Sequence, residues 1–209
     1  MREQLAHYGG ITVMIPAALM IAVWLWYSAP QAFKWWIITV ACTYSIVAFS
    51  KLLFKGWGVS FQTLDIAVLS GHAMNTCLMV TVALSLIARQ FNYAWRWPAT
   101  LVGLSLTVGF SAYCVAPYIH PLNEALAGAL LGAVAAVAFL WRIDVVRVNV
   151  SPSLIGGGLV FLSLCALVPK YNAETLLNHV AVTVSGAQQA QQAHQEPAWR
   201  TVSRHIKAE

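Results

Sequence analysis

Long uncharged stretches dominate the sequence, and the few charged residues fall between them. Six such blocks span residues 4–33, 35–50, 66–88, 97–123, 125–141 and 148–169. Most of them hold the roughly 20 apolar residues that a helix needs to cross the hydrocarbon core of a bilayer. This pattern predicts an all-α, polytopic membrane protein, a bundle of about six transmembrane helices at 11–28, 34–54, 71–88, 98–118, 121–141 and 153–170.

The composition agrees with this interpretation. Of 209 residues, 59% are hydrophobic and 9% are charged, whereas a soluble domain carries about 25% charged residues. The first apolar run, Ile11–Tyr27, is longer than the core of a usual signal peptide, and we interpret it as a retained signal anchor. Tryptophans lie near the expected helix ends, where they predict an aromatic belt at the membrane surface: Trp24, Trp26, Trp35, Trp36, Trp57, Trp95, Trp97 and Trp141.

The net charge of +5 narrows the range of partners. Because the basic residues are spread thinly over loops and ends, they fit anionic membrane lipids better than nucleic acid. The loops after the first, third and fifth expected helices are the more basic ones, with Lys34, Arg89, Arg96, Arg142 and Arg147. The positive-inside rule therefore places the loops after the second and fourth helices outside the cell, in a protein of the bacterial inner membrane.

The small residues and the cysteines indicate how the predicted helices pack. Glycine and alanine crowd the expected helix at 121–141, which predicts close contact with neighbouring helices and a buried position. The four cysteines, Cys42, Cys77, Cys114 and Cys165, lie in apolar segments without paired spacing, so we expect core residues and neither a metal site nor another cofactor. Residues 1–177 form the expected helical domain, and the Gln-rich stretch 178–209 is expected to be a disordered or surface-lying tail.

Two polar stretches suggest an anion site at helix ends. Lys51 and Lys55 are four residues apart and share one helix face, where their mutual repulsion favours a bound anion; they could equally be topology markers that extend toward the membrane surface. Ser70, Gly71 and His72 stand at the start of an expected helix, where free N–H groups attract phosphate oxygens. A capping serine beside an interfacial histidine is the simpler alternative.

A third stretch combines an imidazole and a carboxylate. His120 precedes Pro121, and Glu124 follows one helical turn later. A carboxylate at this spacing fixes the tautomer of the imidazole and raises its basicity, as a nucleophile or a proton shuttle requires. A purely structural His–Glu pair would have the same spacing.

Taken together, the three stretches resemble the type 2 phosphatidic acid phosphatase superfamily, in its membrane branch. That family carries Lys-x6-Arg-Pro, then Pro-Ser-Gly-His, then Ser-Arg-x5-His-x3-Asp. Lys51 matches the first lysine, Ser70, Gly71 and His72 match the second motif, and His120 and Glu124 match the end of the third. The resemblance covers roughly residues 51–140.

The departures from these motifs concern phosphate binding. Gly58 and Val59 stand where the family has Arg-Pro, Leu69 replaces the proline of the second motif, and Tyr113 and Cys114 replace Ser-Arg. Both motif arginines are thus missing, and bidentate arginine contacts are among the strongest to phosphate. Lys55 is the replacement that the nearby sequence offers.

The resemblance implies a metal-independent phosphatase that acts on a phosphorylated lipid. In that mechanism His120 attacks phosphorus, Glu124 orients His120, and His72 protonates the leaving oxygen. Lys51, Ser70 and the Gly71 backbone would hold the phosphate, with Lys55 as an auxiliary. The alternative is a non-catalytic lipid-phosphate-binding or scaffold protein with a degenerate site. A transporter is disfavoured, because the two halves show no evident repeat.

Overall fold

Helices make up the architecture of the protein. The computed structural model describes residues 7–116, 118–146, 148–166 and 174–186. Its seven α-helices are α2 Ile11–Ser28, α3 Pro30–Trp57, α4 Gly71–Phe91, α5 Arg96–Phe110, α6 Leu122–Arg142, α7 Pro152–Ala166 and α8 Glu174–Ser185. The 3₁₀ turns η1 His7–Gly9, η2 Gln62–Leu64 and η3 Tyr93–Trp95, and the π-helical turn η4 Ser111–Val115, complete the list. The predicted all-α class is confirmed.

Within the described residues, five segments are long and apolar enough to cross a membrane: Ile11–Ser28, Pro30–Trp57, Gly71–Phe91, Tyr93–Val115 and Leu122–Arg142. The sixth predicted span, 153–170, corresponds to the shorter apolar helix α7, which has 15 residues. At 1.5 Å per residue this helix is about 22 Å long, less than the roughly 30 Å of hydrocarbon. Residues 167–170 lie outside the described part of the chain. Several apolar spans indicate a multi-pass membrane protein.

Helix α3 is longer than the predicted 34–54 because each end has its own signal. Pro30 occupies its first position, where proline costs no hydrogen bond. At the other end Gly58 adopts φ 71°, and its N–H donates to the Phe54 carbonyl (2.8 Å) while the Val59 N–H donates to the Leu53 carbonyl (3.3 Å). These two bonds form a Schellman motif, which ends the helix after Trp57.

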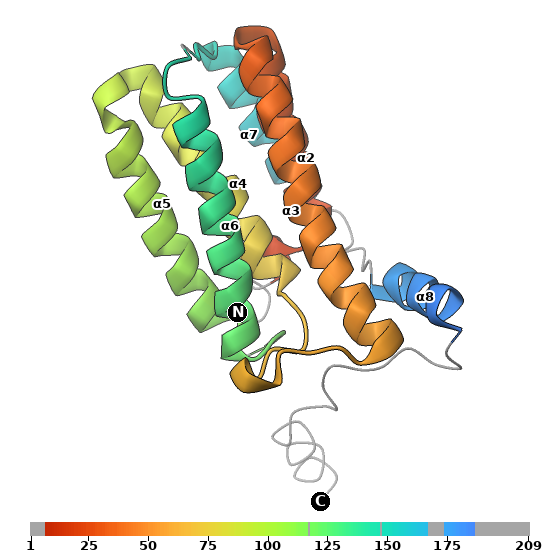
Figure 1. The fold of residues 1–209 in the computed structure, drawn as a ribbon. Coiled ribbons are helices and arrows are strands. Elements are labelled where there is room, and N and C mark those ends of the chain that lie inside the picture. Colours follow the sequence, from red (N-terminus) through yellow and green to blue (C-terminus); the bar gives the residue numbers. More distant parts are fainter. Residues whose placement is uncertain (1–6, 117, 147, 167–173, 187–209) are drawn as a thin grey trace, which may run out of the picture.

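Helix α4 lies in the middle of the bundle, against α2, α5 and α6 (Figure 1). It runs in the same direction as α6, because the Ser70 N–H donates to the Glu124 carbonyl at their starts and Arg89 donates to the Ile143 carbonyl at their ends, each at 3.3 Å. We call the first end, with loops 58–70 and 116–121, the histidine end. The second, with residues 89–96 and 140–150, is the arginine end.

Glycines allow α6 to approach α4 closely. A Cβ at Gly132 would lie 2.5 Å from the Met74 carbonyl oxygen, and one at Gly128 would clash with the Ser70 carbonyl oxygen. The predicted close packing of this helix is therefore confirmed, but its burial is one-sided. The opposite face exposes Leu130 and Val134, which suits contact with lipid.

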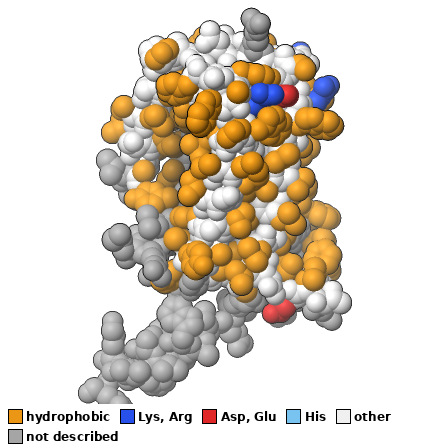
Figure 2. All heavy atoms as spheres, turned by 90° about the vertical axis from the view of Figure 1, so that its left-hand side faces the viewer, with side chains coloured by type: hydrophobic (Ala, Val, Ile, Leu, Met, Phe, Trp, Pro, Cys, Tyr) orange, Lys and Arg blue, Asp and Glu red, His pale blue; other side chains and the backbone are white. Residues whose placement is uncertain are grey.

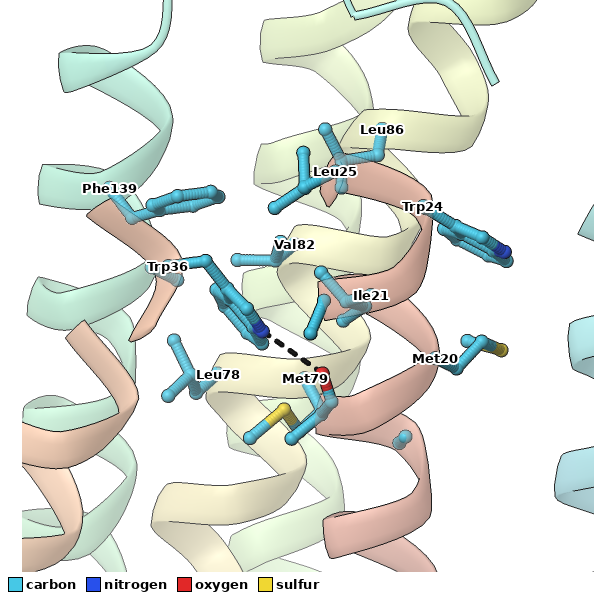
Figure 3. Close-up of a cluster of buried hydrophobic side chains, with 14 of the residues drawn as sticks. Met20, Ile21, Trp24, Leu25, Trp36, Leu78, Met79, Val82, Leu86 and Phe139 are labelled. Atoms are coloured by element: carbon cyan, nitrogen blue, oxygen red, sulfur yellow. Dashed lines mark hydrogen bonds between the residues drawn. The ribbon is translucent and has the colours of Figure 1, made fainter. Parts of the chain in front are cut away.

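Two tryptophans that were predicted to lie in the interfacial belt are core residues. Trp24 and Trp36 are 1% and 0% exposed. The indole N–H of Trp36 donates to the Ala18 carbonyl (3.0 Å), and its ring packs against Phe139 (Figure 3). Trp24 donates to the Leu154 carbonyl of α7. The prediction was wrong here because the interior satisfies the indole N–H; the exposed Trp26, Trp57, Trp95 and Trp141 fit the belt.

The surface agrees with membrane insertion. Hydrophobic side chains cover the height of the face in Figure 2, and charged ones gather toward its two ends. Of the cysteines, Cys77 is buried as predicted, whereas Cys42 is exposed on α3 and was wrongly assigned to the core. Helix α8 runs across the predicted boundary at 177/178, and residues 187–209 of the predicted tail lie outside the described part.

We expect Gly132→Val to destabilise the bundle, because the new side chain would strike the α4 backbone at Met74. Overpacking of this kind costs about 1–3 kcal/mol. Thermal unfolding of the purified protein in detergent, followed by tryptophan fluorescence, measures the loss. Gly109→Val is the matched control, since a Cβ at Gly109 meets nothing within 4 Å. Equal melting temperatures for the two variants would contradict the close approach.

Candidate active site

His120 and Glu124 form a hydrogen-bonded pair at the histidine end. His120 Nδ1 lies 2.8 Å from Glu124 Oε2, which confirms the predicted contact, and the two side chains are 11% and 0% exposed. The local chain favours this arrangement, because Pro121 disfavours a helical conformation at His120 and the α6 helix begins at Leu122. The pair is thus set across the first turn of α6.

The other oxygen of the Glu124 carboxylate binds the backbone. Glu124 Oε1 accepts the N–H groups of Ala67 (3.0 Å) and Val68 (3.1 Å) in the loop before α4. These two bonds occupy lone pairs of the buried carboxylate. In the tautomer with a proton on Nδ1, His120 donates to Glu124 Oε2, and the lone pair of Nε2 is then available.

Ser70, Gly71 and His72 form the start of α4, as predicted. The buried Ser70 hydroxyl caps the helix by accepting the Ala73 N–H at 3.4 Å. A Cβ at Gly71 would meet Val47 at 3.7 Å, an ordinary contact, so packing does not require glycine there. The start of a helix offers N–H groups and the positive end of the dipole to an anion.

The two histidines come together from the first turn of α4 and from the loop before α6. The ring centroids of His72 and His120 are 6.5 Å apart, with 53° between the ring planes. This separation is too long for a direct hydrogen bond between the rings, so each can face a third group. His72 is half-buried.

Lys51 and Lys55 have different surroundings although they share α3. Lys51 is 8% exposed. The adjacent Ser50 accepts the Leu69 N–H at 3.2 Å, so this turn of α3 lies beside the start of α4. Lys55 lies one turn further along and donates to Asn178 Oδ1 of α8 at 2.6 Å. The structure therefore pairs Lys55 with α8.

The contact between turn η1 and the first turns of α4, next to His72, was not predicted from the sequence. Asn75 Nδ2 donates to the Gly9 carbonyl at 3.2 Å, and a Cβ at Gly9 would lie 2.8 Å from the His72 carbonyl oxygen. Turn η1 thus packs directly on the first turns of α4. A buried asparagine in an apolar helix was the available signal, because polar groups at membrane depth need partners.

Three of the basic loop residues lie at the other end of the bundle. Arg89 and Arg96 contact Asp144, and Arg142 stacks on Trp35 at 4.5 Å from the ring centroid. At 1.5 Å per residue, about 25 Å of α4 separates His72 from Arg89. Arg147 lies outside the described residues. A cavity of about 570 Å³ also lies at this arginine end.

Comparison with known proteins finds a family match for the part of the chain that holds the histidine end. The family model of the PAP2 superfamily matches residues 53–147. Residues 53–147 form a PAP2 superfamily domain. An uncharacterized 22.5 kDa protein in the cps region of Klebsiella pneumoniae is 29% identical over 191 residues, which cover 87% of this chain and 90% of that protein. No solved structure matches the chain.

The match of residues 53–147 to the PAP2 superfamily suggests phosphatase activity, because that superfamily generally comprises phosphatases. The PAP2 domain holds both histidines and Glu124, and Lys51 lies just before it. Gly58 and Cys114, at the two motif arginine positions, fall inside the domain. Gly58 closes α3 with a positive φ, and Cys114 lies in the π-helical turn that leads toward His120.

We expect Glu124→Ala to destabilise the histidine end more than Glu124→Gln does. Alanine leaves the Ala67 and Val68 N–H groups without their acceptor, and each buried unsatisfied group costs about 1–3 kcal/mol. Glutamine keeps one carbonyl oxygen for this role. Thermal unfolding together with the rate of proteolysis within loop 58–70 measures the difference. If alanine and glutamine had equal effects, the carboxylate would not hold this loop.

Proposed function

We propose that this protein is a membrane phosphatase that hydrolyses a lipid phosphate or pyrophosphate through a phosphohistidine intermediate, without a metal ion. The observation that carries the proposal is the contact of His120 Nδ1 with the buried Glu124. The ring centroid of His72 lies 6.5 Å from that of His120. This pair of imidazoles supports a nucleophile in the loop before α6 and an acid in the first turn of α4. The fold and the PAP2 match support the reaction class.

In the proposed reaction His120 Nε2 attacks phosphorus, and the bond from phosphorus to the leaving oxygen breaks. Glu124 keeps the proton on Nδ1 and stabilises the positive charge that develops on the ring. His72 gives a proton to the leaving oxygen. It then takes a proton from the water that hydrolyses the phosphohistidine, which restores both histidines.

The phosphate oxygens need positive partners during this reaction. The Gly71 backbone at the start of α4 and the Lys51 ammonium are the proposed ones. Ser70 acts by fixing the start of α4, because its hydroxyl is buried and already accepts the Ala73 N–H. The contact of Lys55 with Asn178 favours a role in holding α8. It does not support the predicted auxiliary role of Lys55 in phosphate binding.

The position of the site supports a lipid substrate. It lies where α3 ends and where α4 and α6 begin, so acyl or prenyl chains can stay among the apolar helix faces while the phosphate reaches the histidines (Figure 1). Phosphatidate, phosphatidylglycerophosphate, a polyprenyl pyrophosphate and lipid A phosphates all have this form. We place the protein in a bacterial inner membrane with the site outside, because the arginine end carries the more basic loops.

A non-catalytic lipid-phosphate-binding protein is the second candidate. The observation in its favour is the loss of both motif arginines, at Gly58 and Cys114. Removing one donor that stabilises a transition state costs about 10²–10³ in rate. Binding without turnover would need Lys51 and the start of α4 but not the nucleophile.

We expect purified protein in detergent to release inorganic phosphate from at least one of these lipids, at a rate that a chelator leaves unchanged. His120→Ala should abolish release, because it removes the nucleophile. His72→Ala should matter least for an aryl phosphate, whose leaving group needs no proton. Gel filtration and thermal unfolding check that the variants are folded.

Lys51 distinguishes the two candidates. Lys51→Ala should raise KM, whereas the matched Lys55→Ala should leave it nearly unchanged, because Lys55 contacts α8. If wild-type protein releases no phosphate from any candidate lipid but binds one with an affinity that Lys51→Ala weakens, the binding function replaces the enzyme.

We expect Cys114→Arg to raise kcat/KM by about tenfold or more, because it returns a guanidinium to the family's motif position. Cys114→Leu is the matched control for side-chain size, and it should leave the rate unchanged or lower. Phosphate release is the measurement. An arginine variant no faster than the leucine variant would show that this position no longer reaches the phosphate.

A further inference from the structure

The cavity at the arginine end has a lining unlike that of the lipid-facing surface. It has a volume of about 570 Å³, and its lining includes Arg89, Gln90, Tyr93, Asp144 and Asn149. These residues come from the end of α4, from η3 and from the loop after α6. Arg89 and Asp144 thus line the space, and Arg96, which is not part of the lining, contacts the same carboxylate.

Arg96 forms a closer contact with the Asp144 carboxylate than Arg89 does. Its Nε and Nη2 donate to the two carboxylate oxygens of Asp144, at 2.7 and 3.4 Å, and its guanidinium stacks on Tyr93 at 3.9 Å from the ring centroid. The hydrogen bond from Arg96 holds the pKa of Asp144 below its ordinary value. Asp144 is therefore an anion at neutral pH, and its charge is largely matched by Arg96.

Arg89 is left with weaker partners. Its side chain is 2% exposed, its ion pair with Asp144 is 3.7 Å long, and its Nη groups donate to the Ile143 and Leu140 carbonyls at 3.3 and 3.4 Å. Its buried Nε has no hydrogen-bond partner among the described residues. A buried cation with an unused donor is costly unless another acceptor is supplied.

We propose that this cavity is a second anion site, which binds the phosphate group of an anionic phospholipid or free inorganic phosphate. A phosphate in this space would meet Arg89, Gln90 and Asn149, and Arg89, Arg96 and Asp144 together carry a net positive charge. The site is about 25 Å along α4 from the two histidines and is independent of the catalytic proposal.

The surroundings suit a lipid headgroup in particular. Trp95 and Trp141, exposed by 60% and 75%, flank this end of the bundle, and such tryptophans mark the level of the headgroups. The positive-inside rule places the same end in the cytoplasmic leaflet, which carries anionic lipids. A phosphate there would meet the cavity from the membrane surface.

Asn149 gives a mild test of this site, because it is exposed and lines the cavity. Asn149→Asp keeps the size of the side chain and adds a negative charge beside the proposed anion. Asn149→Ser is the neutral control, and Arg142→Gln removes a cation from the same end but away from the cavity. Lys51→Ala reports on binding at the histidine end instead.

Binding to the purified full-length chain in detergent would be measured by native mass spectrometry and thermal unfolding, with phosphatidylglycerol, phosphatidylcholine and inorganic phosphate as separate probes. We expect phosphatidylglycerol to bind more tightly than phosphatidylcholine. Asn149→Asp should weaken it about fivefold or more, and Asn149→Ser and Arg142→Gln should change it less than about twofold.

The outcomes separate the two sources of phosphate. Selective binding of phosphatidylglycerol that Asn149→Asp weakens supports a lipid headgroup, and binding of inorganic phosphate alone with the same sensitivity supports the free anion. No binding of either probe, or binding that Asn149→Asp leaves unchanged, overturns the proposal. None of these results depends on whether the histidine end releases phosphate.

Discussion

The buried carboxylate of Glu124 is the constraint on which the histidine end depends. A fully buried carboxylate is stable only when its lone pairs are occupied, and Glu124 meets this condition with groups from two separate segments: Ala67 and Val68 before α4, and His120 before α6. If any of these groups moved away, the buried Glu124 carboxylate would lose a hydrogen-bond partner. The contacts that hold the loop before α4 are therefore also the contacts that orient the proposed nucleophile, so the stability and the chemistry of this end are coupled.

The parallel course of α4 and α6 extends this constraint through the bundle. Gly128 and Gly132 let the two backbones approach, which fixes how far each helix can slide along the other. The starts of both helices then meet at the histidine end and their final turns meet at the arginine end. Because the N-terminal dipoles point toward one membrane surface and the C-terminal carbonyls toward the other, the first end favours anions and the second favours arginines. Arg89 uses this directly, since it donates to carbonyls in the last turn of α6 and the residue after it.

The sequence was a good guide to whatever is local along the chain. Apolar length predicted the five long spans, and the four-residue spacing predicted the contact of His120 with Glu124. It was a poor guide to which face of a helix is buried: Trp24 and Trp36 lie near helix ends, yet they point inward and donate to carbonyls of neighbouring helices. Contacts between distant residues were also missed. The backbone bonds of Glu124 and the pairing of Lys55 with Asn178 join segments far apart in the sequence. The spacing of apolar residues along one helix does not predict such contacts.

The loss of the motif arginines acquires a physical meaning from this geometry. The end of a helix dipole carries about half an elementary charge and, unlike a guanidinium, cannot follow the phosphate as it moves toward the transition state. Lys51 adds a full charge, but an ammonium binds as a point and not as a bidentate fork. An anion would thus be held at the start of α4 with less orientation than two arginines would provide. In the proposed reaction the remaining orientation would come from the reacting groups themselves, and the contact of His120 with the Glu124 carboxylate would supply part of it.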